Sequence, residues 1–196
     1  MYAWTFLAAT AIIAIAAYLL LSGFLKTYRL YRGVRVITCP ENLQPASVRV
    51  AAFDAAKWFA FSGETDPHLR TCSRWPEMAG CDEACLSQIQ SAPHACLVNT
   101  MVTSWYAEKH CHYCGKAIGE IVWHERPPAV LLPDGTTEEW KNIAPERLPD
   151  VFAHGWPVCW ACNTIETFRR ENPSMVIERV RMAVKTHAIA PTVNVY

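Results

Sequence analysis

The sequence predicts an α+β protein in which a single N-terminal transmembrane helix precedes a small cytoplasmic domain with antiparallel hairpins, several helices and a four-cysteine metal site. Three observations support this fold class. Residues 2–25 are apolar and uncharged, alternating β-branched segments are separated by turn residues, and two CxxC pairs begin at Cys111 and Cys159. With 196 residues and 52% apolar side chains, the chain can bury the core of one or two small domains.

The uncharged N-terminal run has the length of a membrane span. A helix of about 24 residues is about 36 Å long, which is enough to cross a bilayer. Aromatic residues stand near both ends of the run, where a membrane interface favours them. A cleaved signal peptide is a poorer interpretation, because no basic segment precedes the run and no small-x-small cleavage site follows it. A buried core helix is poorer still at this length.

The residues that flank the run predict its orientation. Lys26, Arg29, Arg32 and Arg35 follow it directly, and no basic side chain precedes it. Positive flanks stay on the cytoplasmic side, so we expect a single-pass membrane protein whose C-terminal domain is cytoplasmic. Cysteines remain reduced there and can bind metal, whereas the opposite orientation would favour disulfides.

The first half of the domain has the signals of a hairpin and three helices. Residues 34–39 and 47–50 alternate and are interrupted by prolines, which predicts a β-hairpin. The alanine-rich segment 51–61 favours a short helix. A second helix is expected to stop before Pro93, and the apolar spacing within 95–109 predicts a third.

The second half alternates extended and helical patterns. Asp134-Gly135 lies between extended segments and is a strong hairpin signal. Asn163, followed three residues later by a glutamate, resembles a helix N-cap. We therefore predict strands at 119–124, 129–132 and 137–143, a helical turn at 145–152, and helices at 163–171 and 174–185.

The two CxxC pairs predict a metal site formed by Cys111, Cys114, Cys159 and Cys162. A two-residue spacer lets a tight turn direct both thiolates at one ion, and two such turns complete a tetrahedral set of four sulfur ligands. Gly115 follows the first pair, where a positive φ is useful. The expected ion is zinc, with iron as the alternative. A helix that starts beside the second pair is expected to lower the pKa of its thiols.

These four cysteines, Gly115 and the proline and aromatic residues before the second pair resemble zinc-ribbon and rubredoxin-like metal modules over residues 111–162. The resemblance implies a metal-stabilised module and, in the rubredoxin case, an iron site that transfers single electrons. We accordingly predict four segments. They are a transmembrane anchor with its basic flank (1–32), an α+β subdomain with extra cysteines (33–109), a zinc-ribbon-like module (110–172), and a C-terminal helix and tail (173–196).

The other five cysteines allow a second metal or cluster site. Their spacing matches no familiar module, and the alternative is that they are small buried hydrophobic residues. Two of them, Cys81 and Cys85, are four residues apart and are expected on one helical face. The possible second site draws on Cys39, Cys72, Cys81, Cys85 and Cys96.

Several functions are disfavoured by residue type. Haem attachment needs histidine where Gly115 and Asn163 stand, and a thioredoxin-like dithiol needs a single CxxC in a βαβ unit. Lys plus Arg and Asp plus Glu number 18 each, so we expect no nucleic-acid partner. A metal bound by four cysteines leaves no position for a substrate or water, so we expect neither zinc catalysis nor a small-molecule substrate.

The favoured interpretation is therefore a non-enzymatic one. We expect a membrane-anchored accessory or assembly subunit of a membrane protein complex, with a structural zinc site. Its partners are other subunits of that complex and the lipid bilayer, which residues 2–25 contact. Two alternatives remain, a rubredoxin-like electron carrier at the membrane face and a thiol or metal sensor that uses the cysteines at 72, 81 and 85.

Overall fold

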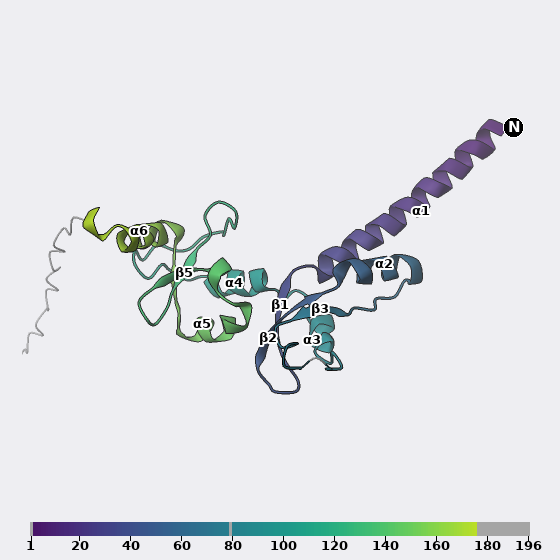
Figure 1. Ribbon diagram of the computed structural model, residues 1–196. Coiled ribbons are helices and arrows are strands. Elements are labelled where there is room, and N and C mark those ends of the chain that lie inside the picture. Colours follow the sequence, from purple (N-terminus) through teal and green to yellow (C-terminus); the bar gives the residue numbers. More distant parts are fainter. Residues whose placement is uncertain (1, 79, 176–196) are drawn as a thin grey trace, which may run out of the picture.

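The computed structural model describes residues 2–78 and 80–175, and in these ranges helices and antiparallel sheets are mixed, as predicted (Figure 1). The α-helices are α1 (Tyr2–Tyr31), α2 (Ala52–Ser62), α3 (Leu86–Ser91), α4 (Val98–Tyr106), α5 (Leu148–His154) and α6 (Trp160–Glu171). One sheet has the order β1 (Val34–Thr38), β2 (Pro45–Val50), β3 (Leu69–Cys72). The other has β4 (Ala129–Leu131) between β5 (Thr137–Glu139) and β6 (Trp156–Val158).

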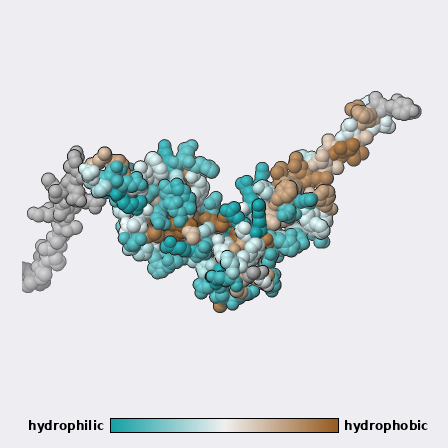
Figure 2. Space-filling view, viewed as in Figure 1, coloured by the Kyte–Doolittle hydropathy of each residue, from teal (hydrophilic) through white to brown (hydrophobic). Residues whose placement is uncertain are grey.

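Helix α1 is a single rod that extends away from the rest of the molecule (Figure 1). Residues 4–22 are exposed along its whole circumference. Within the described residues it is one helix that is long and apolar enough to span a membrane, by length and composition. Its hydrophobic surface continues to the junction with α2, which lies beside its C-terminal part (Figure 2).

The first lobe (residues 33–97) contains the predicted hairpin. β1 and β2 pair antiparallel from Val34 opposite Arg49 to Thr38 opposite Pro45, and the helix predicted after them is α2. β3 adds a third strand that the sequence analysis missed. A core of apolar residues from one face of this hairpin and from α2 and α3 fills the lobe, and it includes Tyr31 at the end of α1.

Strand β1 connects the two lobes because its successive side chains point to opposite faces. Ile37 belongs to the core of the first lobe, whereas its neighbour Val36 belongs to the core of the second. β1 is hydrogen-bonded to β2 along one edge, and on the other the N–H of Val36 donates to Cys96. Because each face of β1 packs in the core of a different lobe, the strand is buried on both faces.

The second lobe (residues 98–172) is built on α4 and the second sheet. The predicted hairpin at Asp134-Gly135 is present, and Gly135 has a φ of +84°. The Asp134 carboxylate accepts hydrogen bonds from the N–H and the hydroxyl of Thr136, which stabilises the turn. α4 spans Val98–Tyr106 of the longer predicted helix, and its Val102 and Tyr106 are buried in this lobe.

Two expectations for local structure were wrong. The predicted strand at 119–124 is a series of turns, closed by the N–H groups of Glu125 and Arg126, which both donate to Val122. Cys81 and Cys85 do not share a helical face, because α3 begins only at Leu86. In each case a local pattern of apolar or small residues suggested regular structure, but nearby prolines and turn residues determine the backbone.

Helix α6 begins three residues earlier than predicted. Its N-cap is Cys159, with an extended ψ of 157°, and Asn163 is a buried residue within the helix. The predicted helix at 174–185 lies almost entirely outside the described residues, whose last element is the 3₁₀ turn Pro173–Met175. The boundaries of the four predicted segments stay a prediction.

Candidate metal centre

The first cysteine pair lies on a tight loop after α4. The N–H of Cys111 donates to the carbonyl of Lys116 at 2.8 Å, and the N–H of Gly115 donates to the carbonyl of Cys111 at 2.9 Å. Gly115 has a φ of +68°, a conformation that glycine adopts without a steric penalty. The loop therefore folds back on itself and presents Cys111 and Cys114 on the same side.

The second pair is positioned by a strand and a helix. β6 leads the chain to Cys159, which caps α6, and Cys162 lies in the first turn of that helix. The N–H of Asn163 donates to the carbonyl of Cys159 at 3.0 Å, so the turn that carries both cysteines is helical. The spacing of two residues thus places both side chains on one side of the helix start.

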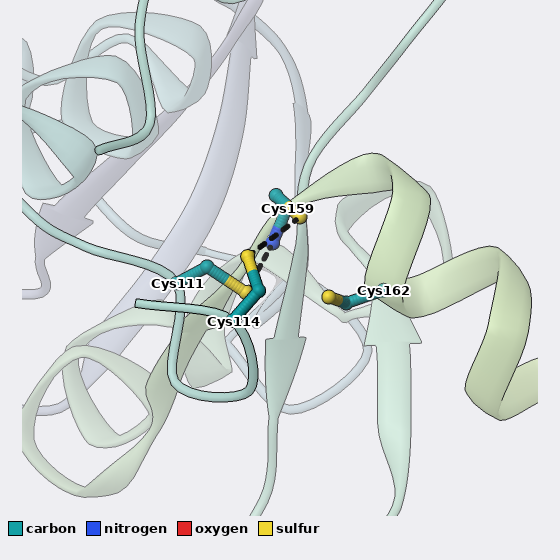
Figure 3. A group of neighbouring side chains, drawn as sticks. All are labelled: Cys111, Cys114, Cys159 and Cys162. Atoms are coloured by element: carbon teal, nitrogen blue, oxygen red, sulfur yellow. Dashed lines mark hydrogen bonds between the residues drawn. The ribbon is translucent and has the colours of Figure 1, made fainter. Parts of the chain in front are cut away.

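Two backbone contacts hold the pairs together. The N–H of His112 donates to the carbonyl of Pro157 at 2.8 Å, and the N–H of Cys159 donates to the Sγ atom of Cys111 at 3.3 Å. The Sγ atoms of Cys114 and Cys159 are 3.9 Å apart. Figure 3 shows the four cysteines gathered between the loop and the start of α6.

The four sulfur atoms fit a tetrahedral metal ion. All of them lie within 4.8 Å of one another. In a tetrahedron of thiolates about 2.3 Å from zinc, the sulfur atoms are about 3.8 Å apart. Only small movements of the cysteine side chains are therefore needed for the four sulfur atoms to bind one ion. The cluster can therefore bind a metal ion, and the same four-sulfur geometry suits zinc or a single iron.

Burial differs among the four ligands. Cys111 is 2% exposed and packs with the sheet residues Ala129 and Val158, whereas Cys114 is exposed. Cys159 and Cys162 are half-buried. The site thus has an apolar floor, formed by the second sheet, and one side that faces solvent.

The thiols of the cluster do not ionise alike. Burial opposes ionisation of Cys111, but hydrogen bonds from the N–H groups of Cys159, Cys114 and Tyr113 outweigh it and lower its pKa to about 7. Burial raises the pKa of Cys162, and its hydrogen bonds with the other three sulfur atoms raise it further. Cys159 also has a raised pKa, chiefly through burial.

This pattern corrects the expectation that the start of α6 would lower the pKa of both Cys159 and Cys162. The helix terminus is present, but burial and the neighbouring sulfur atoms have the larger effect on these thiols. Four thiolates this close repel one another, so a cation is required to keep all four charged. A metal ion bound by the cluster would supply that positive charge.

The other five cysteines fall into two places in the first lobe. Cys96 lies beside Arg35, and its thiol donates hydrogen bonds to the carbonyls of Ala92 and Pro93. The remaining four line one small cavity, although within residues 2–78 and 80–175 only the cluster of the second lobe has its ligand atoms all within 4.8 Å. Those four are Cys39, Cys72, Cys81 and Cys85.

The sequence analysis missed the strand that completes the site. β6 has three residues, and it pairs with β4 from Ala129 opposite Val158 to Leu131 opposite Trp156. A tryptophan and a valine after Gly155 are a weak strand signal, and a three-residue run is too short to show alternation. The hydrogen bond from the Cys159 N–H to Cys111 depends on this pairing and has no signal in the sequence.

No protein-family model matches the chain, and no curated protein or solved structure is significantly similar to it. The resemblance to zinc ribbons and rubredoxins therefore stays a prediction based on the motif, and the function has to be argued from the geometry.

Proposed function

We propose that this protein is a single-pass membrane protein with a cytoplasmic domain, and that it serves as an accessory or assembly subunit of a membrane complex. A structural zinc ion bound by Cys111, Cys114, Cys159 and Cys162 holds its second lobe together. The observation that carries this proposal is that α1 is an apolar helix packed into the folded domain.

The contacts at the end of α1 argue for a retained anchor. Tyr31 is 4% exposed and Thr27 is 5% exposed, and Tyr31 belongs to the core of the first lobe. Farther up the helix, the ring of Phe24 makes an edge contact with Phe53 of α2, with 5.5 Å between centroids. Cleavage within the apolar run would remove part of this packing, whereas a signal sequence normally contributes nothing to the mature fold.

Helix α2 provides a second apolar surface next to the anchor. Phe53, Trp58 and Phe61 are 60%, 55% and 81% exposed, and the helix lies beside the part of α1 nearest the domain (Figures 1 and 2). Aromatic residues are favoured at the boundary between lipid and water. This supports a position of α2 at the membrane surface, with the lobes on the side to which α1 leads.

The basic flank supports the cytoplasmic orientation with three residues instead of four. Lys26, Arg29 and Arg32 are exposed after the apolar run, whereas Arg35 is fully buried and does not contribute to the flank. Reporter fusions at the C-terminus test the orientation. A green fluorescent protein fusion should fluoresce and an alkaline phosphatase fusion should be inactive, and the reverse result would overturn this part of the proposal.

The nature of the metal site supports a structural role, which suits an accessory or assembly subunit. Four cysteine ligands leave a metal without an open position, so the ion stabilises structure and does not bind substrate. The site joins a loop, a strand and a helix, and therefore sets the shape of the second lobe.

The test is genetic and biochemical. In the native host, deletion of this chain should prevent assembly of one membrane complex on native gels, and the full chain should restore it. A Cys162→Ser variant should fail to restore assembly, whereas the matched variant Thr164→Ser, on an exposed position of the same helix, should succeed. Unchanged membrane complexes in the deletion strain, together with no partner in mild detergent, would refute the proposal.

One observation supports the electron carrier as a second candidate. The N–H of Cys159 donates to the Sγ atom of Cys111, and Cys114 is exposed. Hydrogen bonds to cysteine sulfur tune the potential of iron sites, and an exposed ligand offers a route for electrons. Metal analysis and a visible spectrum of protein purified without oxygen or chelator separate the two. Zinc without colour excludes the carrier, whereas iron with charge-transfer absorption excludes the purely structural role.

A further inference from the structure

A second group of four cysteines surrounds one cavity in the first lobe. Cys39 follows β1, Cys72 ends β3, and the loop before α3 contributes Cys81 and Cys85. All four line a cavity of about 20 Å³, which is roughly the space of a single water molecule. Three separate segments of the chain therefore bring sulfur atoms to one small space.

The surface of this cavity is mostly apolar, and the four cysteines are its soft metal ligands, although the charged residues Glu41, Arg74, Asp82 and Glu83 also line it. Ile37, Ala46, Leu69 and Trp75 line it together with the cysteines. Cys85 is 6% exposed and the other three are half-buried, at the edge of the core of the first lobe. A soft cation suits such a site, since thiolates bind zinc well and an apolar surround excludes competing water.

Three of these cysteines lie near enough to Cys85 to affect the charge of its thiol. Burial raises the pKa of Cys85 to about 11, and repulsion from Cys72, Cys81 and Cys39 contributes in the same direction. A cation placed among them would replace this repulsion with attraction. Cys96 is not part of the group, because it does not line the cavity and its thiol donates to the carbonyls of Ala92 and Pro93.

The loop between β3 and α3 contains no helix or strand in its described part, and hydrogen bonds at Ser73 and Glu83 attach it to the rest of the lobe. In its described part, residues 73–78 and 80–85, it forms only turns, such as those in which Trp75 donates to Cys72 and Cys81 donates to Met78. Glu83 has a φ of +57°, and its carboxylate accepts a hydrogen bond from the N–H of Leu69 at 3.0 Å. Long irregular segments are uncommon in compact domains. The cysteines lie at both ends of this one, where a structural metal ion would add folding energy.

We propose that Cys39, Cys72, Cys81 and Cys85 form a second tetrahedral thiolate site, which binds a zinc ion and fastens the loop before α3 to the sheet of the first lobe. The cavity lies between the four side chains, and binding draws the sulfur atoms inward to about 2.3 Å from the ion. The nine cysteines then divide into two sets of four ligands and Cys96, which lies outside both sets.

Metal content of the full-length protein is the first test. Protein purified in detergent without oxygen or chelator should contain about two zinc ions per chain, and the double variant Cys81→Ser/Cys85→Ser about one. The matched control is Cys96→Ser, which should keep about two because Cys96 lies outside both sets. If the folded double variant keeps as much zinc per chain as the unsubstituted protein, the proposal is overturned, whatever metal the second lobe binds.

A second measurement needs no substitution in the first lobe and so avoids misfolded variants. With cobalt in place of zinc, a Cys114→Ser/Cys162→Ser variant should still show the absorption of a tetrahedral cobalt-thiolate site. In the unsubstituted protein, maleimide should label Cys39, Cys72, Cys81 and Cys85 only after the metal is removed. It should label Cys96 to the same extent before and after metal removal. Disulfides among the four, found by mass spectrometry of the denatured protein, would contradict the proposal and show an oxidising compartment.

Discussion

At the scale of single residues, Arg35 is the most deeply buried charge in the described chain. It is 0% exposed, and its guanidinium donates to the carbonyl of Tyr31 at 2.6 Å and to that of Leu30. These carbonyls belong to the last turn of α1, which has no further helical residues to satisfy them. Arg35 therefore joins the end of the anchor to the first strand of the domain.

Replacement of this side chain should separate the anchor from the domain. Arg35→Met removes charged hydrogen bonds to buried carbonyls, and we expect a loss of about 3 kcal/mol in the free energy of unfolding. The measurement is denaturant unfolding of the full chain in detergent, followed by tryptophan fluorescence. Arg49→Met, at an exposed position of β2, should change stability by less than about 0.5 kcal/mol. Equal midpoints for both variants would disprove this role of Arg35.

Tyr106 is the buried polar residue that links α4 to the second sheet. It is 1% exposed, its hydroxyl donates to the carbonyl of Ala129, and it accepts a hydrogen bond from Trp140 Nε1 at 2.9 Å. Burial raises the pKa of this hydroxyl well above its usual range. The folded protein thus disfavours the tyrosinate form.

This shift predicts a loss of stability at alkaline pH. Because the pKa is higher in the folded state, the contribution is fully present below the unfolded pKa of about 10 and falls by about 1.4 kcal/mol per pH unit above it. Tyr106→Phe should cost about 1–3 kcal/mol at neutral pH but should remove this steep decline. Unfolding free energies measured from pH 8 to 11 check the prediction, and parallel profiles for the two proteins would rule it out.

At the scale of elements, the connection from α5 to β6 decides whether the metal site can form. A Cβ atom at Gly155 would lie 2.6 Å from a methyl group of Val130 and 2.7 Å from the carbonyl oxygen of Val151. The following strand, β6, pairs with β4 and leads to Cys159. The absence of a side chain at this position therefore allows β6 to lie close to the sheet.

Gly155→Ala should consequently affect both folding and metal binding. We expect a loss of about 1–3 kcal/mol in stability through overpacking, and weaker zinc affinity because Cys159 is displaced. Competition with a chromophoric chelator measures the affinity. Gly119→Ala is the control, since a Cβ atom there meets nothing within 4 Å. If both variants bind zinc like the unsubstituted protein, β6 does not set the position of Cys159.

At the scale of the whole molecule, β1 couples the two lobes through the opposite faces of one strand. Val36 packs in the second lobe and Ile37 in the first. Val36→Ala removes buried methyl groups and should cost about 1–2.5 kcal/mol, mainly in the second lobe. Hydrogen exchange should show faster opening there than in the first lobe. The control is Val122→Ala, at an exposed position; uniform exchange across both lobes after Val36→Ala would contradict the coupling.

The sequence by itself determined the features that depend on local pattern. The apolar run of α1, the hairpin of β1 and β2, the turn at Asp134-Gly135 and the CxxC pairs are each encoded within a few neighbouring residues. Hydrophobicity, β-branching and turn chemistry act over that range, so a linear reading detects them. The four ligands in the second lobe were found for the same reason.

Tertiary structure decided what depends on residues far apart in the chain. β3 and β6 are short strands that exist because a neighbouring strand pairs with them, and Arg35 is buried because α1 ends above it. The pKa values of Cys159 and Cys162 follow from burial and sulfur neighbours that only the fold brings together, which outweigh the helix terminus visible in the sequence. The selection of Cys39, Cys72, Cys81 and Cys85, with Cys96 left aside, likewise required the cavity, because spacing alone cannot show which side chains meet.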